Sequence, residues 1–209
     1  IIADVGLASI HLFGVIMAIF LGITLVSNEV DRKTIYLILS KPVRRFEFIL
    51  GKTLGLNFTL ALTTLAMAVV LFLVHLAYRY GGRVETGIFV ASAGIYMELV
   101  LLTCLATLFS TFTTPVLSAI FTISLFFVGH VTTYLYVLGE RSQAAAVRWV
   151  SRGLFYLLPN LENFNWKNEV VYGGVKSFAV PGLAAGYLVL YGAGVLALAC
   201  LLFSRKDFK

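Results

Sequence analysis

Five long apolar runs, separated by short polar segments, divide this chain. Each run has about twenty residues or more, the length that an α-helix needs to cross the hydrocarbon core of a bilayer. The runs are continuously apolar, whereas membrane strands alternate apolar and polar positions. The pattern therefore predicts an all-α, polytopic helical membrane protein with spans at about residues 5–26, 54–77, 88–109, 116–138 and 182–203.

Composition supports lipid as the solvent of this protein. Hydrophobic residues make up 60% of the 209 positions and charged residues only 12%, against about 25% charge in soluble domains. The sequence shows no separate soluble domain, so residues 1–209 are interpreted as a single transmembrane domain. The net charge of +6 does not indicate a nucleic-acid partner, because most basic residues flank the spans, where they set orientation.

The polar segment 27–52 carries a dense block of charge between the first two runs. Its basic residues outnumber its acids, and short basic loops lie on the cytoplasmic side of a membrane. An apolar turn at 35–39 predicts a short amphipathic helix inside this loop. The same rule places the C-terminal tail in the cytoplasm, because Arg205, Lys206 and Lys209 directly follow the last run.

This orientation puts the first residue of the chain outside the membrane without a signal peptide. The topology therefore predicts an additional span upstream of Ile1, so that the five spans belong to a six-span protein with both ends in the cytoplasm.

The external segment 139–181 contains its own helical pattern. Between Gln143 and Leu158 apolar residues recur at helical spacing, while Arg148 and Arg152 form another stripe beside Trp149. Such a helix lies in the plane of the interface with its apolar face toward lipid. Pro159 is expected to end it.

Three ionisable residues fall inside the apolar runs: His11, Glu98 and His130. An intramembrane carboxyl group is costly in lipid and faces a partner or a wet cavity. Glu98 and His130 therefore mark either a translocation path for substrate or protons, or a buried structural bond between Glu98 and a Thr or Tyr of a neighbouring span. The spacing H-E-x-x-H is absent, and the sequence predicts no metal site, no cofactor and no catalytic set.

Two further patterns in the sequence involve glycine. Gly51-Lys52-Thr53 imitates the end of a phosphate-binding loop, but Phe46 stands where that motif requires glycine, which argues against a nucleotide site. Small residues at helix-packing spacing predict close helix approach within a bundle or against a second copy: Gly51, Gly55, Gly182, Gly186, Gly192 and Gly194.

The charged block and four other segments resemble permeases of the type-2 ABC transporter class. In the block, the resemblance is carried by Glu29, Thr34, Leu39-Ser40, Pro42-Val43, Arg45 and Gly51-Lys52. Elsewhere it is carried by LFSTFTTPVLSAI at 108–120, FFVGH at 126–130, LLPNLENFN at 157–165 and FSRKDF at 203–208. More narrowly, these segments look like the branch that includes permeases of nitrous-oxide reductase maturation, a copper enzyme.

The resemblance implies a membrane subunit of an exporter in a bacterial-type inner membrane. In this class the cytoplasmic helix is a coupling helix that docks on a separate ATP-binding subunit, which holds ATP and Mg²⁺. Two permease halves, here expected as a homodimer, work with two ATPases, and a periplasmic partner fits the narrower branch. The residues that would contact the ATPase are Glu29, Asp31, Arg32, Lys33, Thr34, Ile35, Tyr36, Ile38, Ser40, Pro42 and Arg45.

Two alternatives stay open at this level. The protein is an intramembrane enzyme that uses Glu98 or His130, or it is an ATPase-linked scaffold that transmits force without transport. The substrate is not readable from these residues.

Overall fold

The computed structural model describes residues 2–31, 45–78, 84–167 and 179–204, and the described part of the chain is helical without strands. This confirms the predicted all-α class. Five helices are long and apolar enough to cross a membrane. They are α1 (Ile2–Asp31), α3 (Arg45–Ala77), α4 (Val84–Phe112), α5 (Pro115–Arg141) and α8 (Ala179–Ser204), joined by the shorter α6 (Ala145–Leu157) and a 3-10 turn, η1 (Leu161–Phe164).

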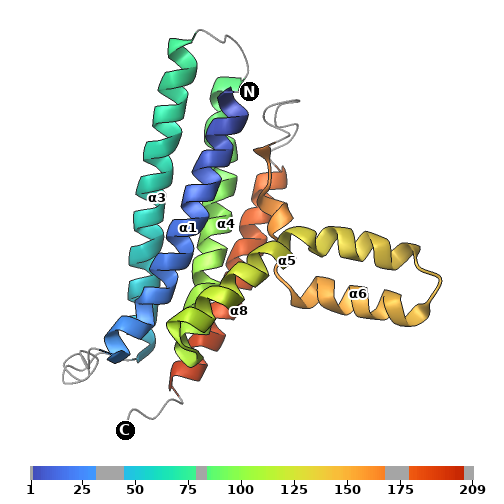
Figure 1. Ribbon diagram of the computed structural model, residues 1–209. Coiled ribbons are helices and arrows are strands. Elements are labelled where there is room, and N and C mark those ends of the chain that lie inside the picture. Colours follow the sequence, from blue (N-terminus) through green and yellow to red (C-terminus); the bar gives the residue numbers. More distant parts are fainter. Residues whose placement is uncertain (1, 32–44, 79–83, 168–178, 205–209) are drawn as a thin grey trace.

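Helix α4 is the centre of the bundle. It packs against α1, α3, α5 and α8, and it is the most buried of the five long helices. Figure 1 shows α1, α3, α4 and α8 running along the bundle, while α5 starts beside the lower end of α4 and leaves the bundle obliquely, together with α6. A polar residue in the middle of α4 is therefore enclosed by other helices instead of facing lipid.

The helix ends alternate between the two ends of the bundle. The ends at Asp31, Arg45, Phe112, Pro115 and Ser204 lie at one end (Figure 1), as the predicted topology requires. The helices extend into the segment 27–52: α1 continues through 31 and α3 begins at 45. No Gly or Pro interrupts the chain between Gly22 and Pro42, so nothing in the sequence ends α1 where its apolar run ends.

Glycines of α1 set how closely α1 approaches α4. A Cβ on Gly14 would lie 2.6 Å from a methyl carbon of Leu99, and one on Gly22 would lie 2.6 Å from the Cβ of Ala106. The glycines singled out from sequence behave differently. A Cβ on Gly51, Gly55, Gly182, Gly186 or Gly194 would meet no described atom. Their predicted role in close packing within the chain is wrong, because they lie on helix faces that point away from the neighbouring helices.

Helices α5 and α6 form a hairpin that projects from the bundle (Figure 1). The predicted amphipathic helix is present over Ala145–Leu157 and ends before Pro159. Its Trp149 is 74% exposed, and Arg148 and Arg152 are also exposed. Arg152 donates two hydrogen bonds to Glu140 of α5, at 2.6 and 3.0 Å, which tie the two helices together.

Candidate functional site

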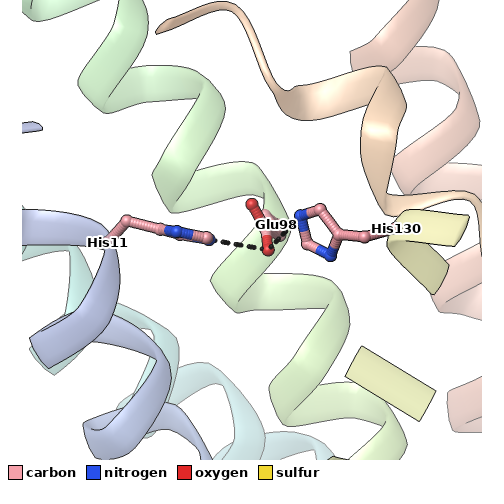
Figure 2. Close-up of side chains that lie close together, drawn as sticks. All are labelled: His11, Glu98 and His130. Carbon is pink, nitrogen blue, oxygen red and sulfur yellow. Dashed lines mark hydrogen bonds and ion pairs between the residues drawn. The ribbon is translucent and has the colours of Figure 1, made fainter. Parts of the chain in front are cut away.

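Glu98 lies in the middle of α4 and is only 1% exposed. Two histidines from neighbouring helices point toward its carboxylate, His11 from α1 and His130 from α5 (Figure 2). The Nε2 atom of His11 lies 2.9 Å from Oε1 of Glu98, and the Nε2 atom of His130 lies 3.5 Å from the same oxygen. We call these three residues the His–Glu–His cluster.

The hydrogen bonding of His130 fixes which of its ring nitrogens carries a proton. Nδ1 lies 3.0 Å from the carbonyl oxygen of Phe126, one helical turn earlier. A carbonyl oxygen only accepts, so Nδ1 must donate. In a neutral imidazole the other nitrogen then bears a lone pair. In this neutral form, the lone pair of His130 Nε2 is directed at the Glu98 carboxylate.

Phe126 also forms an aromatic wall beside the cluster. Its ring centroid lies 4.8 Å from that of His130 and 5.8 Å from that of His11. An apolar wall of this kind excludes water and lowers the local dielectric. Charges and hydrogen bonds inside the cluster are consequently stronger than they would be at the surface.

The chain after α6 folds back over the cluster. We call residues 158–167 the cap segment. Its Leu161, Phe164 and Trp166 are buried, and they pack where α4 and α5 carry glycine. A Cβ on Gly94 would lie 2.6 Å from the Phe164 carbonyl oxygen, and one on Gly129 would lie 2.7 Å from a side-chain carbon of Leu161. Gly94 is one turn from Glu98 and Gly129 precedes His130, so the cap segment packs on α4 and α5 beside the cluster.

Hydrogen bonds hold the cap segment to α5 and α8. The backbone N–H of Asn160 donates to the hydroxyl of Tyr187 at 2.9 Å. The side-chain amide of Asn160 lies 3.1 Å from the hydroxyl oxygen of Thr133. Just before the cap segment, the carbonyl oxygen of Leu157, the last residue of α6, accepts a hydrogen bond from the hydroxyl of Tyr191 at 2.9 Å. These hydrogen bonds fix the position of the cap segment relative to α5 and α8.

A cation at the end of the cap segment acts on the cluster. Burial lowers the pKa of the Lys167 ammonium, while the negative charges of Glu98 and Glu162 raise it in opposition. Desolvation disfavours the charged amine, and a nearby carboxylate favours it. Lys167 therefore lies within electrostatic reach of Glu98.

Sequence reasoning placed His11, Glu98 and His130 inside the spans but did not identify Glu98 as the common partner of the two histidines. It proposed a Thr or Tyr bonded to Glu98, whereas the structure places His11 there. His11 and Glu98 are 87 positions apart, so no local motif could join them. The signal that was available is that each of three different runs carries one ionisable side chain in its interior. Lys167 and the cap segment gave no such signal.

Most residues of the predicted coupling surface lie outside the described residues: Arg32, Lys33, Thr34, Ile35, Tyr36, Ile38, Ser40 and Pro42. Of the others, Glu29 and Asp31 belong to the last turns of α1, and Arg45 is the first residue of α3. The end of α1 and the start of α3, which adjoin this segment in the sequence, lie at the same end of the bundle (Figure 1).

Comparison with known families covers almost the whole chain. A family model described as ABC-2 family transporter protein matches residues 2–208. The chain belongs to this family. No curated protein and no solved structure matches the chain significantly.

Membership in the ABC-2 family makes this chain a multi-pass membrane permease subunit of an ABC transporter. The family in general works with an ABC ATP-binding partner and is a transport subunit rather than a catalytic one. The narrower resemblance to permeases of nitrous-oxide reductase maturation goes beyond this match and stays a prediction.

Proposed function

We propose that this ABC-2 permease is the membrane half of an ATP-driven exporter, moved by a separate ATPase through the segment between α1 and α3. The observation that carries the proposal is the family match over residues 2–208. Its match includes all five membrane-spanning helices, so the resemblance is not confined to one loop.

The predicted coupling segment has the chemistry that docking requires. Ile35, Tyr36 and Ile38 supply an apolar surface of the helix-in-groove type. Arg32 and Lys33 supply charge for a partner. Helices α1 and α3 flank the segment at the same end of the bundle and both pack on α4. A movement of the coupling segment would therefore be transmitted to α4 through the direct contacts of α1 and α3. ATP and Mg²⁺ would bind the partner ATPase, in two copies.

A second permease copy fits the glycines that face away from the bundle. Gly51 and Gly55 lie on α3, and Gly182 and Gly186 lie on α8, with open space beside each of them. Small residues let membrane helices of two chains approach closely. We expect a homodimer in a bacterial-type inner membrane with the C-terminus in the cytoplasm. A periplasmic partner is expected if the narrower resemblance holds.

Glu98 and His130 are the residues we place on the translocation path. Ionisable side chains inside membrane spans usually line substrate or ion pathways. The cap segment covers the cluster from the side predicted to be external. Movement of α4 against the cap segment would then open or close the path.

Co-purification tests the coupling part of this proposal. Full-length protein, expressed with the ABC ATPase encoded beside it, is solubilised and purified through a tag on the permease. Retention of the ATPase, and ATP-dependent flux in vesicles that contain both subunits, is the expected result. A permease that retains no ATP-binding subunit in several mild detergents would contradict it.

The His–Glu–His cluster specifically favours one alternative, an intramembrane enzyme. Activity that persists without ATP or ATPase and disappears in Glu98→Gln would support the enzyme over the exporter. ATP-dependent conformational change without flux would support a force-transmitting scaffold.

A further inference from the structure

We propose that His11, Glu98 and His130 form a binding site for a divalent transition-metal ion of the zinc class, held between α1, α4 and α5. The three side chains each offer one ligand atom, and these atoms lie within 4.8 Å of one another. The proposal concerns binding alone, and it holds whether or not the ion is transported.

The donor set points to the class of ion. Open zinc sites combine two imidazole nitrogens with one carboxylate oxygen and leave a fourth position for water or another ligand. Imidazole suits Zn²⁺, Cu²⁺, Ni²⁺ and Fe²⁺, whereas Mg²⁺ and Ca²⁺ prefer oxygen ligands only. Soft thiolates select Cu⁺. Cys104 and Cys200 are not members of the cluster, which disfavours that ion.

The distances from the two histidines to Glu98 need little adjustment to accept an ion. Ligand atoms about 2.0–2.1 Å from a tetrahedral zinc ion are separated from each other by about 3.3 Å. The His130 Nε2 to Glu98 Oε1 distance is 3.5 Å, and the corresponding His11 distance is 2.9 Å. Small rotations of the two rings, one inward and one outward, would bring both pairs to the required spacing. The two histidine nitrogens, which lie within 4.8 Å of each other, would approach each other in the same movement.

His130 is prepared for metal binding by its backbone hydrogen bond. Metal-ligating histidines usually donate their other ring N–H to a carbonyl or carboxylate group, which fixes the tautomer and orients the ring. The Phe126 carbonyl does this for Nδ1 of His130 at 3.0 Å. Nε2 is left as a lone pair, the form in which imidazole binds a metal.

With both imidazoles neutral and no cation bound, the cluster contains an unfavourable contact. If His11 donates its Nε2–H to Glu98, the neutral His130 still directs a lone pair at the same oxygen. Two electron pairs facing each other in a water-poor site repel. A divalent ion placed between Glu98 and the two imidazoles replaces this repulsion by three attractive contacts, and His11 then carries its ring proton on Nδ1 instead of Nε2. Lys167 contributes positive charge near Glu98, which weakens metal binding without occupying the ligand positions.

Metal titration of the purified full-length protein tests the site. The protein is stripped with a chelator, exchanged into chelator-free detergent, and titrated calorimetrically with Zn²⁺. A parallel titration with Co²⁺ follows the visible absorption that reports four-coordinate nitrogen and oxygen ligation. We expect one ion per chain. His11→Gln, Glu98→Gln and His130→Gln should each weaken Zn²⁺ binding at least about tenfold.

His75→Gln is the matched control, because it makes the same substitution on α3, and His75 is outside the cluster. It should keep wild-type affinity. Circular dichroism and size-exclusion profiles establish that each variant is folded. If Glu98→Gln fails to fold, His130→Gln decides the matter, since that side chain is 23% exposed and less critical to packing. Wild-type protein without saturable Zn²⁺ binding, or equal affinity in wild type and His130→Gln, would overturn the site.

Discussion

Gly94 of α4 lies directly against the backbone of Phe164 in the cap segment. A Cβ at position 94 would stand 2.6 Å from the Phe164 carbonyl oxygen and 2.9 Å from the ring of Trp166. Neither neighbouring atom belongs to the far end of a flexible side chain. The indole N–H of Trp166 also donates to the Asn163 carbonyl oxygen at 2.9 Å, which fixes the ring. The close approach of cap segment and helix therefore depends on glycine at this position.

Gly94→Val should lift the cap segment from α4. Overpacking of this kind costs about 1–3 kcal/mol, and it should expose Trp166, which is now buried. Because the chain has only two tryptophans, Trp149→Phe leaves Trp166 as the single reporter. We expect its fluorescence emission to shift to longer wavelength and to become accessible to an aqueous quencher. Gly153→Val on α6 is the control, since a Cβ there meets no described atom. An unshifted emission spectrum in Gly94→Val would contradict the close contact between Gly94 and the cap segment.

Asn57 of α3 and Thr103 of α4 should show only a modest energetic coupling. The Thr103 hydroxyl lies 2.7 Å from the Asn57 side-chain oxygen, and both residues are buried. The same hydroxyl lies 2.8 Å from the Val100 carbonyl oxygen, so it keeps an acceptor when Asn57 is lost. A double-mutant cycle of Asn57→Leu and Thr103→Val, measured by unfolding in mixed micelles, should give about 0.6 kcal/mol. A coupling energy several times larger would mean that the Val100 carbonyl does not replace Asn57 as the acceptor for the Thr103 hydroxyl.

The spans were predictable because their signal is local. The apolar residues of each run indicate by themselves that the run lies in lipid. The structure has its five long apolar helices at the predicted places. The interfacial helix was predictable for the same reason, since Val147, Val150 and Leu154 recur within one short segment. The ends were less predictable, because a helix continues past its apolar run until glycine, proline or a cap ends it.

The site itself was only partly predictable. Glu98 and His130 stood out because charge is costly in lipid, but the identity of their partner depends on how α1 packs on α4. That packing follows from Gly14 and Gly22, whereas the sequence drew attention to other glycine pairs. The sequence places the cap segment within the external segment 139–181 but does not indicate that Leu161, Phe164 and Trp166 are buried against the bundle.

Lys167 should titrate below the ordinary lysine value of 10.5. Burial favours its neutral amine, so the unfolded chain holds more protons than the folded one between the two pKa values. Stability then rises with pH across this window, and the cost of burying the ammonium ion disappears above the ordinary value. Reductive ¹³C-methylation and NMR titration should show one lysine signal with a lowered midpoint, which Lys167→Arg removes. Glu98→Gln should lower the midpoint further, because the Glu98 charge favours the ammonium form; an unchanged midpoint would place Lys167 outside the reach of Glu98.

Charge reversal at Arg32 and Lys33 should separate docking from membrane insertion. If these side chains face an ATPase, Arg32→Glu with Lys33→Glu replaces attraction by repulsion, and like charges across an interface cost several kcal/mol. We expect the variant to insert normally but to retain the ATPase at least about tenfold less well in co-purification. Arg79→Glu with Arg83→Glu is the matched control, because it makes the same change of charge between the spans at 54–77 and 88–109, where the alternation of spans predicts the opposite, external side. Normal ATPase retention by the Arg32/Lys33 variant would remove these residues from the contact surface, whereas loss in both variants would indicate a general effect of charge on assembly.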